Sequence, residues 1–403
     1  MTKKILIIGA GVEQAPAIQM AKDLGYHVLT SDYNPDAPGM RIADQSFVIS
    51  TDDKEGNLEV AIQNQINGVM TLCSETAVPV VGYICEKMGL KGFSEDTALK
   101  STNKGSMRIA MEENRVPMPA RAHIDLFSEA EEFTSEHSGP WVLKPSDSSG
   151  QRGTNLVSER SKLLESFEEA KEYSTDDKVL IDQFVGGQEI NVCAVVKNGE
   201  VHVLSLADRN TLPSPYFGIA INHIAPPALS TEEIDQVLEV VEGSIKAIGL
   251  ENGIAYPQII VSKDGPKLIE IAARIPGGYN REMAMNLSGV DMIKAQILLA
   301  LDEDFSVQEL VESPKHKSSG VKLLTSVDYP ELVGATLKQI EGKEKVLAIP
   351  GVQACHFHIQ TGDVIPHLEN SVGRFMAIIA VGESKEEVQN ILLKAKEVIK
   401  IIC

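Results

Sequence analysis

Short apolar runs alternate with amphipathic stretches over the first quarter of the chain, a pattern typical of alternating strands and helices. Ile5–Ile8 has the composition of a buried strand, Gly9–Gly11 provides a tight turn, residues 15–24 have helical spacing, and the run ending at Asp32 predicts a second strand. Later runs predict strands at 47–49 and 68–72 and helices at 58–65 and 79–88. The pattern therefore indicates a doubly wound, mostly parallel α/β unit over residues 1–93.

Gly9-x-Gly11, with Asp32 at the end of the second strand, allows a dinucleotide-binding interpretation of this unit. The third glycine of the dinucleotide fingerprint is missing, because Gln14 stands in its place. The alternative is that the glycines serve only the strand–helix turn and that the unit helps to enclose a substrate.

Breaker residues delimit a second unit. Pro117 and Pro119 precede it, and Gly186-Gly187 follows it. The pattern inside it predicts strands at 120–124, around Lys144 and at 178–185, and helices at 128–137 and 160–173. An insert with its own small sheet between such breakers is a candidate mobile lid, which we assign to about residues 120–187.

Hairpins and a long helix follow the lid. Lys197–Glu200 separates two strand-like runs, residues 230–248 predict an amphipathic helix, and a second hairpin is expected at 253–273 with a five-residue loop, Ser262–Pro266. The last segment alternates strands with a terminal helix at 384–400. The expected class is thus mixed α/β and α+β, with domains at 1–93, 94–310 and 311–403.

The charge and composition of the chain limit the classes of partner and the cellular location that we expect. The formal net charge of the 403-residue chain is −20, which argues against nucleic-acid or anionic-membrane partners. No window reaches the roughly 18 apolar residues of a membrane span, and the apolar run near the N-terminus is too short for a signal peptide. The five cysteines form no C-x-x-C pair. We therefore expect a cytoplasmic protein with reduced thiols, and a homodimer is left open.

The clearest chemical signal follows the apolar run that ends in Lys144. A loop of small residues, Pro145–Gly153, comes next and leads into a second strand-like run. A lysine supplies a point charge, and glycines let backbone N–H groups approach phosphate oxygens. Strand, lysine, loop and strand in this order predict a triphosphate site; the alternative for Lys144 is an exposed strand end.

The order of four motifs resembles the ATP-grasp superfamily. These are Lys104, Lys144 with its loop, Asp182–Ile190, and Leu268–Arg274. The N-terminal segment is similar to the Rossmann-like pre-ATP-grasp domain of the branch that holds purine-biosynthesis and carbamoyl-phosphate-synthase-like ligases. Asn370-x-x-Gly-Arg374 resembles amino-acid ligases of the superfamily. The resemblance implies an ATP-grasp fold with this N-terminal domain, a mobile lid subdomain and a C-terminal α+β domain.

The resemblance also implies roles in binding ATP. Lys104 and Lys144 would neutralise phosphates, although Lys104 would also suit an exposed helix position. The phosphate loop would use Ser148, Ser149, Gly150, Arg152 and Gly153, with Arg152 either near the transferred phosphoryl group or in solvent. The adenine edge would be read by the backbone of the hinge residues Asp182, Gln183, Phe184 and Val185. Glu189 would bind the ribose hydroxyls, the alternative being an ordinary edge-strand glutamate.

The second hairpin would hold magnesium. Because strand side chains alternate, Leu268, Glu270, Ala272 and Arg274 should share one face, and the five-residue loop would set Gln258 opposite Glu270. Glu270 would bind Mg²⁺ and Gln258 would be a weaker, neutral ligand. Most relatives carry an acidic residue at that position, so the number of bound Mg²⁺ ions stays open.

Two arginines would serve the chemistry. Arg274 would meet the phosphoryl group or the acyl phosphate, and Arg281 would bind a carboxylate, unless it only opens the next helix and pairs with Glu282. The implied activity is an ADP-forming ligase that phosphorylates a small-molecule carboxylate and joins it to an amine, with an amino acid as one substrate. The alternatives are a carboxylase acting through carboxyphosphate and a non-catalytic ATP-binding sensor.

Overall fold

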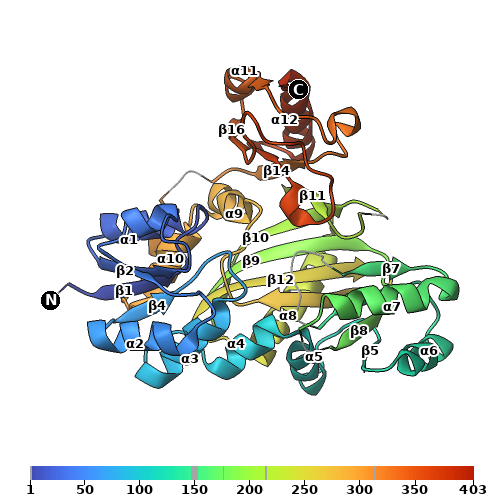
Figure 1. The fold of residues 1–403 in the computed structure, drawn as a ribbon, viewed down its shortest axis with the longest axis horizontal. Coiled ribbons are helices and arrows are strands. Elements are labelled where there is room, and N and C mark those ends of the chain that lie inside the picture. The colour runs from blue at the N-terminus through green and yellow to red at the C-terminus, as the bar shows by residue number, and fades with distance from the viewer. Residues whose placement is uncertain (1, 147–152, 176, 214–215, 313–314) are drawn as a thin grey trace.

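The structure is a computed structural model that describes residues 2–146, 153–175, 177–213, 216–312 and 315–403. In Figure 1 the N-terminal unit lies at the left, the lid at the right and the C-terminal segment at the top. The strands of the N-terminal unit form a parallel sheet in the order β3-β2-β1-β4. Its elements are β1 (Lys4–Ile8), α1 (Ala15–Asp23), β2 (His27–Asp32), β3 (Gln45–Val48), α2 (Lys54–Asn64), β4 (Gly68–Met70) and α3 (Val78–Met88).

This unit has the predicted parallel α/β arrangement, with one helix longer than expected. Helix α2 begins four residues before the predicted start, because the Asp53 side chain accepts a hydrogen bond from the Gly56 N–H and caps the helix. Asp32 accepts hydrogen bonds from the N–H groups of Ala10 (2.8 Å) and Asn34 (2.9 Å). Its carboxylate therefore stabilises the turn after β1. This agrees with the alternative that Gly9 and Gly11 only form the strand–helix turn.

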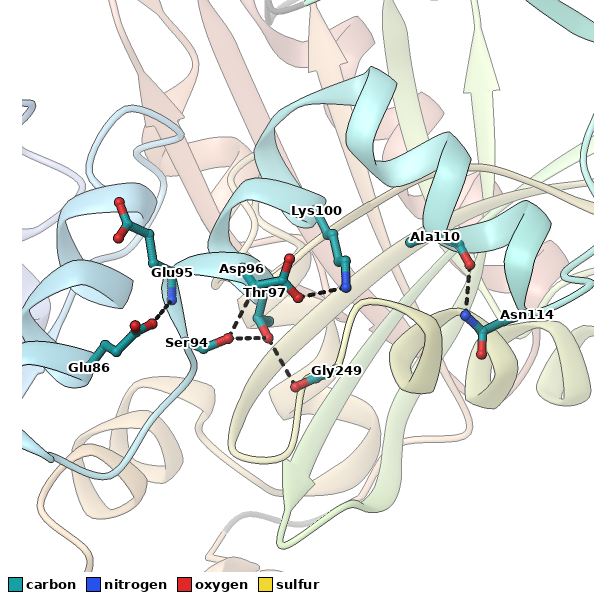
Figure 2. A network of polar contacts seen from close by, with 9 residues as sticks. All are labelled: Glu86, Ser94, Glu95, Asp96, Thr97, Lys100, Ala110, Asn114 and Gly249. Atoms are coloured by element: carbon teal, nitrogen blue, oxygen red, sulfur yellow. Dashed lines mark hydrogen bonds and ion pairs between the residues drawn. The ribbon is translucent and has the colours of Figure 1, made fainter.

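Two helices connect this unit to the rest of the chain, namely α4 (Glu95–Thr102) and α5 (Lys104–Glu113). Figure 2 shows how α4 is fixed: Ser94 caps it by accepting from the Thr97 N–H, and the Thr97 hydroxyl donates to the Gly249 carbonyl (3.1 Å). Asn103 ends α4 and caps α5 through the Ser106 N–H. This chain of caps fixes the position of Lys104, the first residue of α5.

The lid is a four-stranded antiparallel sheet with two helices on it, in the strand order β5-β8-β6-β7. Its elements are β5 (Arg121–Ile124), α6 (Phe127–Glu136), β6 (Trp141–Pro145), β7 (Asn155–Val157), α7 (Leu163–Glu172) and β8 (Val179–Gln183). The lid has a hydrophobic cluster of its own around Trp141 and Phe167, separate from those of the larger sheet. A small unit with a separate core is consistent with the predicted lid subdomain.

The centre of the molecule is an antiparallel sheet of eight strands in the order β13-β12-β9-β10-β11-β14-β17-β16. The central strands and helices are β9 (Gln188–Lys197), β10 (Glu200–Thr211), β11 (Ala220–Ala225), α8 (Thr231–Ala247), β12 (Gly253–Ser262), β13 (Gly265–Ala272), α9 (Asn280–Ser288) and α10 (Met292–Ala300). The C-terminal ones are β14 (Ser318–Leu324), β15 (Gln339–Glu341), α11 (Lys343–Leu347), β16 (Val352–Phe357), β17 (Met376–Gly382), α12 (Lys385–Val398) and β18 (Lys400–Ile402). Strands β11 and β14 pair, so this sheet continues across the predicted boundary at 311.

Within the described residues, no helix combines the length and the apolar character needed to cross a bilayer.

The β12–β13 hairpin corrects two details of the sequence interpretation. Its turn contains only two residues between the paired Ser262 and Gly265, not the five expected. An even-length turn alone would place Gln258 opposite Ile269, but a β-bulge shifts the register and pairs Gln258 with Glu270. The predicted pair is therefore right, although it forms for a different reason.

The same bulge breaks the alternation of side chains along β13. Leu268 belongs to the hydrophobic core, together with Ile271, and is 1% exposed. Glu270, Ala272 and Arg274 line the main cavity, and Leu268 does not. The prediction that all four side chains share one face was wrong for Leu268, because a bulge adds one residue to one strand only.

The glycine pair after the lid offers a matched test of how tightly the lid joins the sheet. A Cβ atom on Gly187 would lie 2.3 Å from the Val261 carbonyl oxygen, whereas one on Gly186 would find only a Phe184 carbon, at 3.8 Å. We expect Gly187→Ala to lower the free energy of unfolding by about 1–3 kcal/mol and Gly186→Ala to change it by less than about 0.5 kcal/mol. Urea unfolding of both variants measures the difference, and equal effects would contradict the close approach.

Candidate active site

The main cavity, of about 710 Å³, lies where the lid, the linker helices and the central sheet meet. Such a volume suits a nucleotide-sized ligand. Most of the predicted site residues that the structure describes line this cavity, and they are Lys104, Lys144, Asp182, Gln183, Phe184, Val185, Glu189, Gln258, Glu270 and Arg274. The structure thus brings together residues spread over 170 positions of the chain.

Lys144 and Asp182 form a buried ion pair on the lid sheet. They are diagonal neighbours on β6 and β8, and Lys144 Nζ lies 2.6 Å from Asp182 Oδ2. Arg108 of α5 donates to the same oxygen from Nη2 at 3.0 Å. All three residues are at most 8% exposed. Because two cations share one carboxylate, this charge cluster of Arg108, Lys144 and Asp182 carries a net positive charge inside the protein.

The pKa values of the cluster reflect this imbalance. Burial alone would raise the pKa of Asp182, but Arg108 and Lys144 outweigh burial and hold it below its ordinary value. Burial is the main cause that lowers the pKa of Lys144, and the repulsion from Arg108 lowers it further. The attraction of Asp182 raises the pKa but does not offset these two effects. An anion placed beside Lys144 would relieve that repulsion, so the cluster favours a phosphate group in the cavity.

Lys104 lies at the N-terminus of α5, close enough to Lys144 to contribute to lowering its pKa. Its backbone N–H donates to the Ser146 carbonyl (3.2 Å), which ties the start of the phosphate loop to the helix. Ser148, Ser149, Gly150 and Arg152 lie outside the described residues. Gly153 is described and is buried; a Cβ there would lie 3.0 Å from Pro145 and Tyr173. Gly153 does not line the cavity, whereas Thr154 does.

The hinge residues use their backbone groups unequally. The N–H of Gln183 donates to the Ala120 carbonyl (2.7 Å) and the N–H of Phe184 to the Pro140 carbonyl (2.9 Å). Among the described residues, the N–H of Val185 makes no such bond, and Val185 lines the cavity. If the hinge reads an adenine, its donor is therefore Val185. The Asp182 side chain takes no part in it, because it belongs to the charge cluster.

Glu189 is held on both sides. Its carboxylate pairs with Arg209 and accepts from the Thr211 hydroxyl (3.0 Å). Both partners belong to β10 and line the cavity with it. Strand β10 thus orients the carboxylate for which binding of the ribose hydroxyls is predicted.

Gln258 and Glu270 face the cavity as cross-strand partners, and their oxygens are the hard donors that Mg²⁺ prefers. Among the described residues, no three His, Cys, Asp or Glu side chains gather as a metal site. One carboxylate and one amide oxygen nevertheless suit Mg²⁺, because this ion commonly completes its shell with phosphate oxygens and water. The pair fits the predicted magnesium site, and Glu270 is its charged member.

Arg274 is positioned from the N-terminal unit. Its Nε donates to Glu75 Oε2 at 2.6 Å, and Glu75 also lines the cavity. Burial alone would lower the pKa of Arg274, but Glu75 outweighs burial and raises it. The guanidinium therefore stays charged and fixed at the edge of the cavity, where it can meet an anionic group.

Arg281 is not brought to the cavity. It is the second residue of α9, and Nε and Nη2 hold both oxygens of Asp291 at 3.1 and 2.7 Å. Asp291 also caps α10 through the Ile293 N–H. Such a two-point ion pair between helices fits the alternative that Arg281 only stabilises the start of α9. A role of Arg281 in binding a carboxylate stays a prediction.

Three residues of the site were missed from the sequence. Glu75 follows β4, at the carboxyl edge where parallel sheets bind ligands, and that position was the available signal. Arg209 gave no clear signal, because it stands shortly before Pro213 and Pro215 in the sequence. Arg108 gave no signal, since an arginine in a helix is usually exposed and only the fold shows that this one is 1% exposed.

Two family models match the chain. Residues 137–281 match an ATP-grasp domain, and residues 333–403 match the L-amino acid ligase C-terminal domain 2. The chain carries an ATP-grasp domain. The resemblance to ATP-grasp ligases, the fold that it implied and the prediction of an enzyme are thereby confirmed.

Proteins similar to this chain match it over most or all of its length. A phosphoribosylamine–glycine ligase of Methanosphaera stadtmanae is 26% identical, over 98% of this chain and 94% of that protein. The uncharacterised protein y4rH of Sinorhizobium fredii is 25% identical, over 81% of this chain and 66% of its own length. An L-amino acid ligase from Bacillus licheniformis has the same fold, with a TM-score of 0.84 at 23% identity, covering 100% and 98% of the two chains.

The charge cluster allows a stability test. Asp182→Asn would leave two buried cations without a carboxylate, so we expect a loss of about 3–5 kcal/mol in the free energy of unfolding at pH 7. Trp141, the only tryptophan, lies in the lid and reports the urea transition by fluorescence. Asp125→Asn, an exposed change in the same lid, is the control and should cost less than about 0.5 kcal/mol.

The pH dependence follows from the lowered pKa of Asp182. The stabilisation by this carboxylate is fully present above its unfolded pKa, about 3.9, and is lost as the pH falls through the lower folded pKa. The difference between wild type and Asp182→Asn should therefore be constant from pH 8 to about pH 5. A difference that shrinks near neutrality would contradict the assigned charge state.

Proposed function

We propose that this protein is an ADP-forming carboxylate–amine ligase that uses ATP and Mg²⁺ and takes an amino acid as a substrate. The observation that carries the proposal is the match of residues 333–403 to the L-amino acid ligase C-terminal domain 2, on the same chain as the ATP-grasp domain. The cavity supports it, because the cations of the lid and the Glu270–Arg274 strand end face one another across a nucleotide-sized space.

The proposed reaction has two steps. A carboxylate oxygen attacks the γ-phosphorus of ATP, and the bond to the bridging oxygen breaks, giving an acyl phosphate and ADP. An amine then attacks the acyl carbon, and phosphate leaves with the C–O bonding electrons while the nitrogen loses a proton. The amide forms without an additional oxidant or reductant.

The chain's residues contribute charge and alignment. Lys104 and Lys144 neutralise phosphate oxygens, and Arg274, held by Glu75, orients the anionic acyl group. Mg²⁺, held by Glu270 and Gln258, would supply further charge neutralisation to the phosphates. Closure of the lid would exclude water, which otherwise hydrolyses an acyl phosphate.

The test follows phosphate release and product mass with ATP, Mg²⁺ and pools of the proteinogenic L-amino acids. Phosphate release that requires organic substrates and yields an amide supports the ligase. Dependence on bicarbonate would instead support the carboxylase, and tight ATP binding without turnover would support the sensor. Hydroxylamine, added with the amino-acid pool, traps an acyl phosphate as a hydroxamate and identifies the activated carboxylate.

Two variants test the site itself. Lys144→Ala and Glu270→Ala should each lower kcat by at least about 10²-fold. The first removes a cation that would stabilise the transferring phosphoryl group, and the second removes the charged ligand that would hold Mg²⁺ beside it. Lys162→Ala removes an exposed lysine from the same lid and should keep full activity. Activity retained within tenfold in either site variant, in protein with an unchanged melting curve, would remove that residue from the catalytic machinery.

Gln258→Glu tests the metal assignment. A second carboxylate beside Glu270 should lower the Mg²⁺ concentration for half-maximal turnover, since carboxylates bind Mg²⁺ more strongly than amides. Calorimetric titration of the ADP complex with Mg²⁺ gives a second readout without turnover. Gln308→Glu, at an exposed position, is the matched control. If the two variants bind Mg²⁺ equally, Gln258 lies outside the metal shell.

A further inference from the structure

Arg108 uses only a small part of its hydrogen-bonding capacity, although its side chain is almost completely buried. Nη2 donates to Asp182 Oδ2 at 3.0 Å, whereas Nε and Nη1 have no hydrogen-bond partner among the described residues. The residue is 1% exposed, so bulk water cannot replace the missing partners. Because an unpaired buried donor is costly, this arrangement is not the one that Arg108 alone would favour.

The carboxylate that faces Arg108 is only half used as well. Arg108 and Lys144 both bind Asp182 through Oδ2, at 3.0 and 2.6 Å. Asp182 Oδ1 is buried and has no hydrogen-bond partner in the described part of the chain. An ion pair between arginine and a carboxylate is strongest when two parallel N–H groups meet both oxygens. Arg108 and Asp182 thus have the unused donors and the unused acceptor that a two-point pair needs, while Lys144 competes for the shared oxygen.

Arg108 belongs to the body of the protein, whereas its partners belong to the lid. Its neighbours on α5, Met107 and Met111, are buried in the hydrophobic core that α5 shares with the central sheet. Asp182 and Lys144 stand on β8 and β6 of the lid sheet. A change in how Arg108 binds Asp182 therefore changes how the lid is held to the body.

Two further contacts place α5 along the lid. Arg121 of β5 donates to Glu112 at 3.1 Å. A Cβ atom on Gly105 would lie only 2.7 Å from His123 Cε1, so α5 and β5 approach each other closely there. Gly105, Arg108 and Glu112 are three and four residues apart, so they follow one side of the helix. Arg108 makes the buried polar contact on the side of α5 that meets the lid.

A phosphate group in the cavity would change the balance around Asp182. Lys144 lines the main cavity and Arg108 does not, so a ligand can reach the ammonium group but not the guanidinium. When Lys144 turns toward a phosphate, Asp182 loses one of its two cations. Arg121, its cross-strand neighbour on β5, is already paired with Glu112. Arg108 is then the cation that can use both carboxylate oxygens.

We propose that Arg108 is a positioning residue that takes both oxygens of Asp182 when Lys144 binds a phosphate of ATP. Nε or Nη1 then joins Nη2 on the carboxylate, which pairs Oδ1 and one of the two unused nitrogens. This change of partners, which we call the Asp182 switch, holds the lid more tightly to α5 as the nucleotide binds. It rests on the proposed function, because it requires ATP phosphates at Lys144.

The first test separates the phosphates from the nucleoside. Calorimetry gives the Kd of adenosine and of the non-hydrolysable analogue AMP-PNP with Mg²⁺. Arg108→Lys keeps the charge but cannot supply two parallel N–H groups, so we expect AMP-PNP to bind at least about tenfold more weakly. Adenosine should bind within about twofold of wild type, because it carries no phosphate. Arg115→Lys, the same exchange at an exposed position just after α5, is the control and should bind both ligands normally.

The second test uses Lys144→Met. Without the ammonium group, Arg108 can meet both oxygens of Asp182 in the absence of any ligand. We therefore expect the lid strands β5, β6 and β8 to be protected from hydrogen–deuterium exchange without nucleotide, to the level that wild type reaches only with AMP-PNP. Arg108→Lys should gain no such protection at saturating AMP-PNP. This measurement needs no turnover, and Lys144→Met decides the question even if Arg108→Lys does not fold.

Several results would overturn the Asp182 switch. These are AMP-PNP binding by Arg108→Lys within about twofold of wild type, equal losses for AMP-PNP and adenosine, a wild-type lid that AMP-PNP does not protect, and a Lys144→Met lid that exchanges as in nucleotide-free wild type. Equal losses for the two ligands would show that Arg108 is only structural. If wild type bound AMP-PNP no more tightly than adenosine, the proposed ATP site itself would be refuted. The two failures are therefore distinguishable.

Discussion

The candidate site depends on one interaction, in which the buried carboxylate of Asp182 forms ion pairs with both Lys144 and Arg108. Lys144 and Asp182 belong to the lid, and Arg108 belongs to α5, so the shared carboxylate joins the lid to the rest of the protein. The same cluster has an excess positive charge next to the main cavity. Joining the lid and attracting a phosphate are thus two consequences of one arrangement, because a single carboxylate cannot neutralise two cations.

This arrangement explains how a chain of net charge −20 can serve anionic ligands. The global charge would repel ATP and carboxylates at long range, so binding depends on cations that the fold gathers and partly desolvates. At the lid the gathered cations are Lys104, Lys144 and Arg108. At the far strand ends they are Arg209 and Arg274, each already paired with a glutamate and thereby fixed in direction. The ion pairs with glutamates fix the orientation of these two arginines, whereas the excess positive charge at the lid attracts the anionic ligand.

Most of the order of strands and helices was predictable from the sequence, because apolar periodicity and breaker residues specify these elements locally. The features that depend on contacts between distant residues were not predictable in this way. The bulge in β13 has no turn-like signature, yet it decides which side chains face the cavity and moves Leu268 into the core. The ion pair of Arg281 with Asp291, ten residues further along the chain, could likewise be identified only in the folded chain.

The candidate site was predictable where the family resemblance points to a residue and a local strand places it at the cavity, as for Lys144, Glu189 and Glu270. It was not predictable where a second unit supplies the partner, as Glu75 does for Arg274. The continuous eight-stranded sheet extends this dependence to the C-terminal segment. Lys385 of α12 pairs with Asp208 of β10, next to Arg209, so the segment is anchored on the strand that lines the cavity. A segment anchored in this way keeps a fixed position beside the cavity, while the lid remains the part whose separate core permits movement.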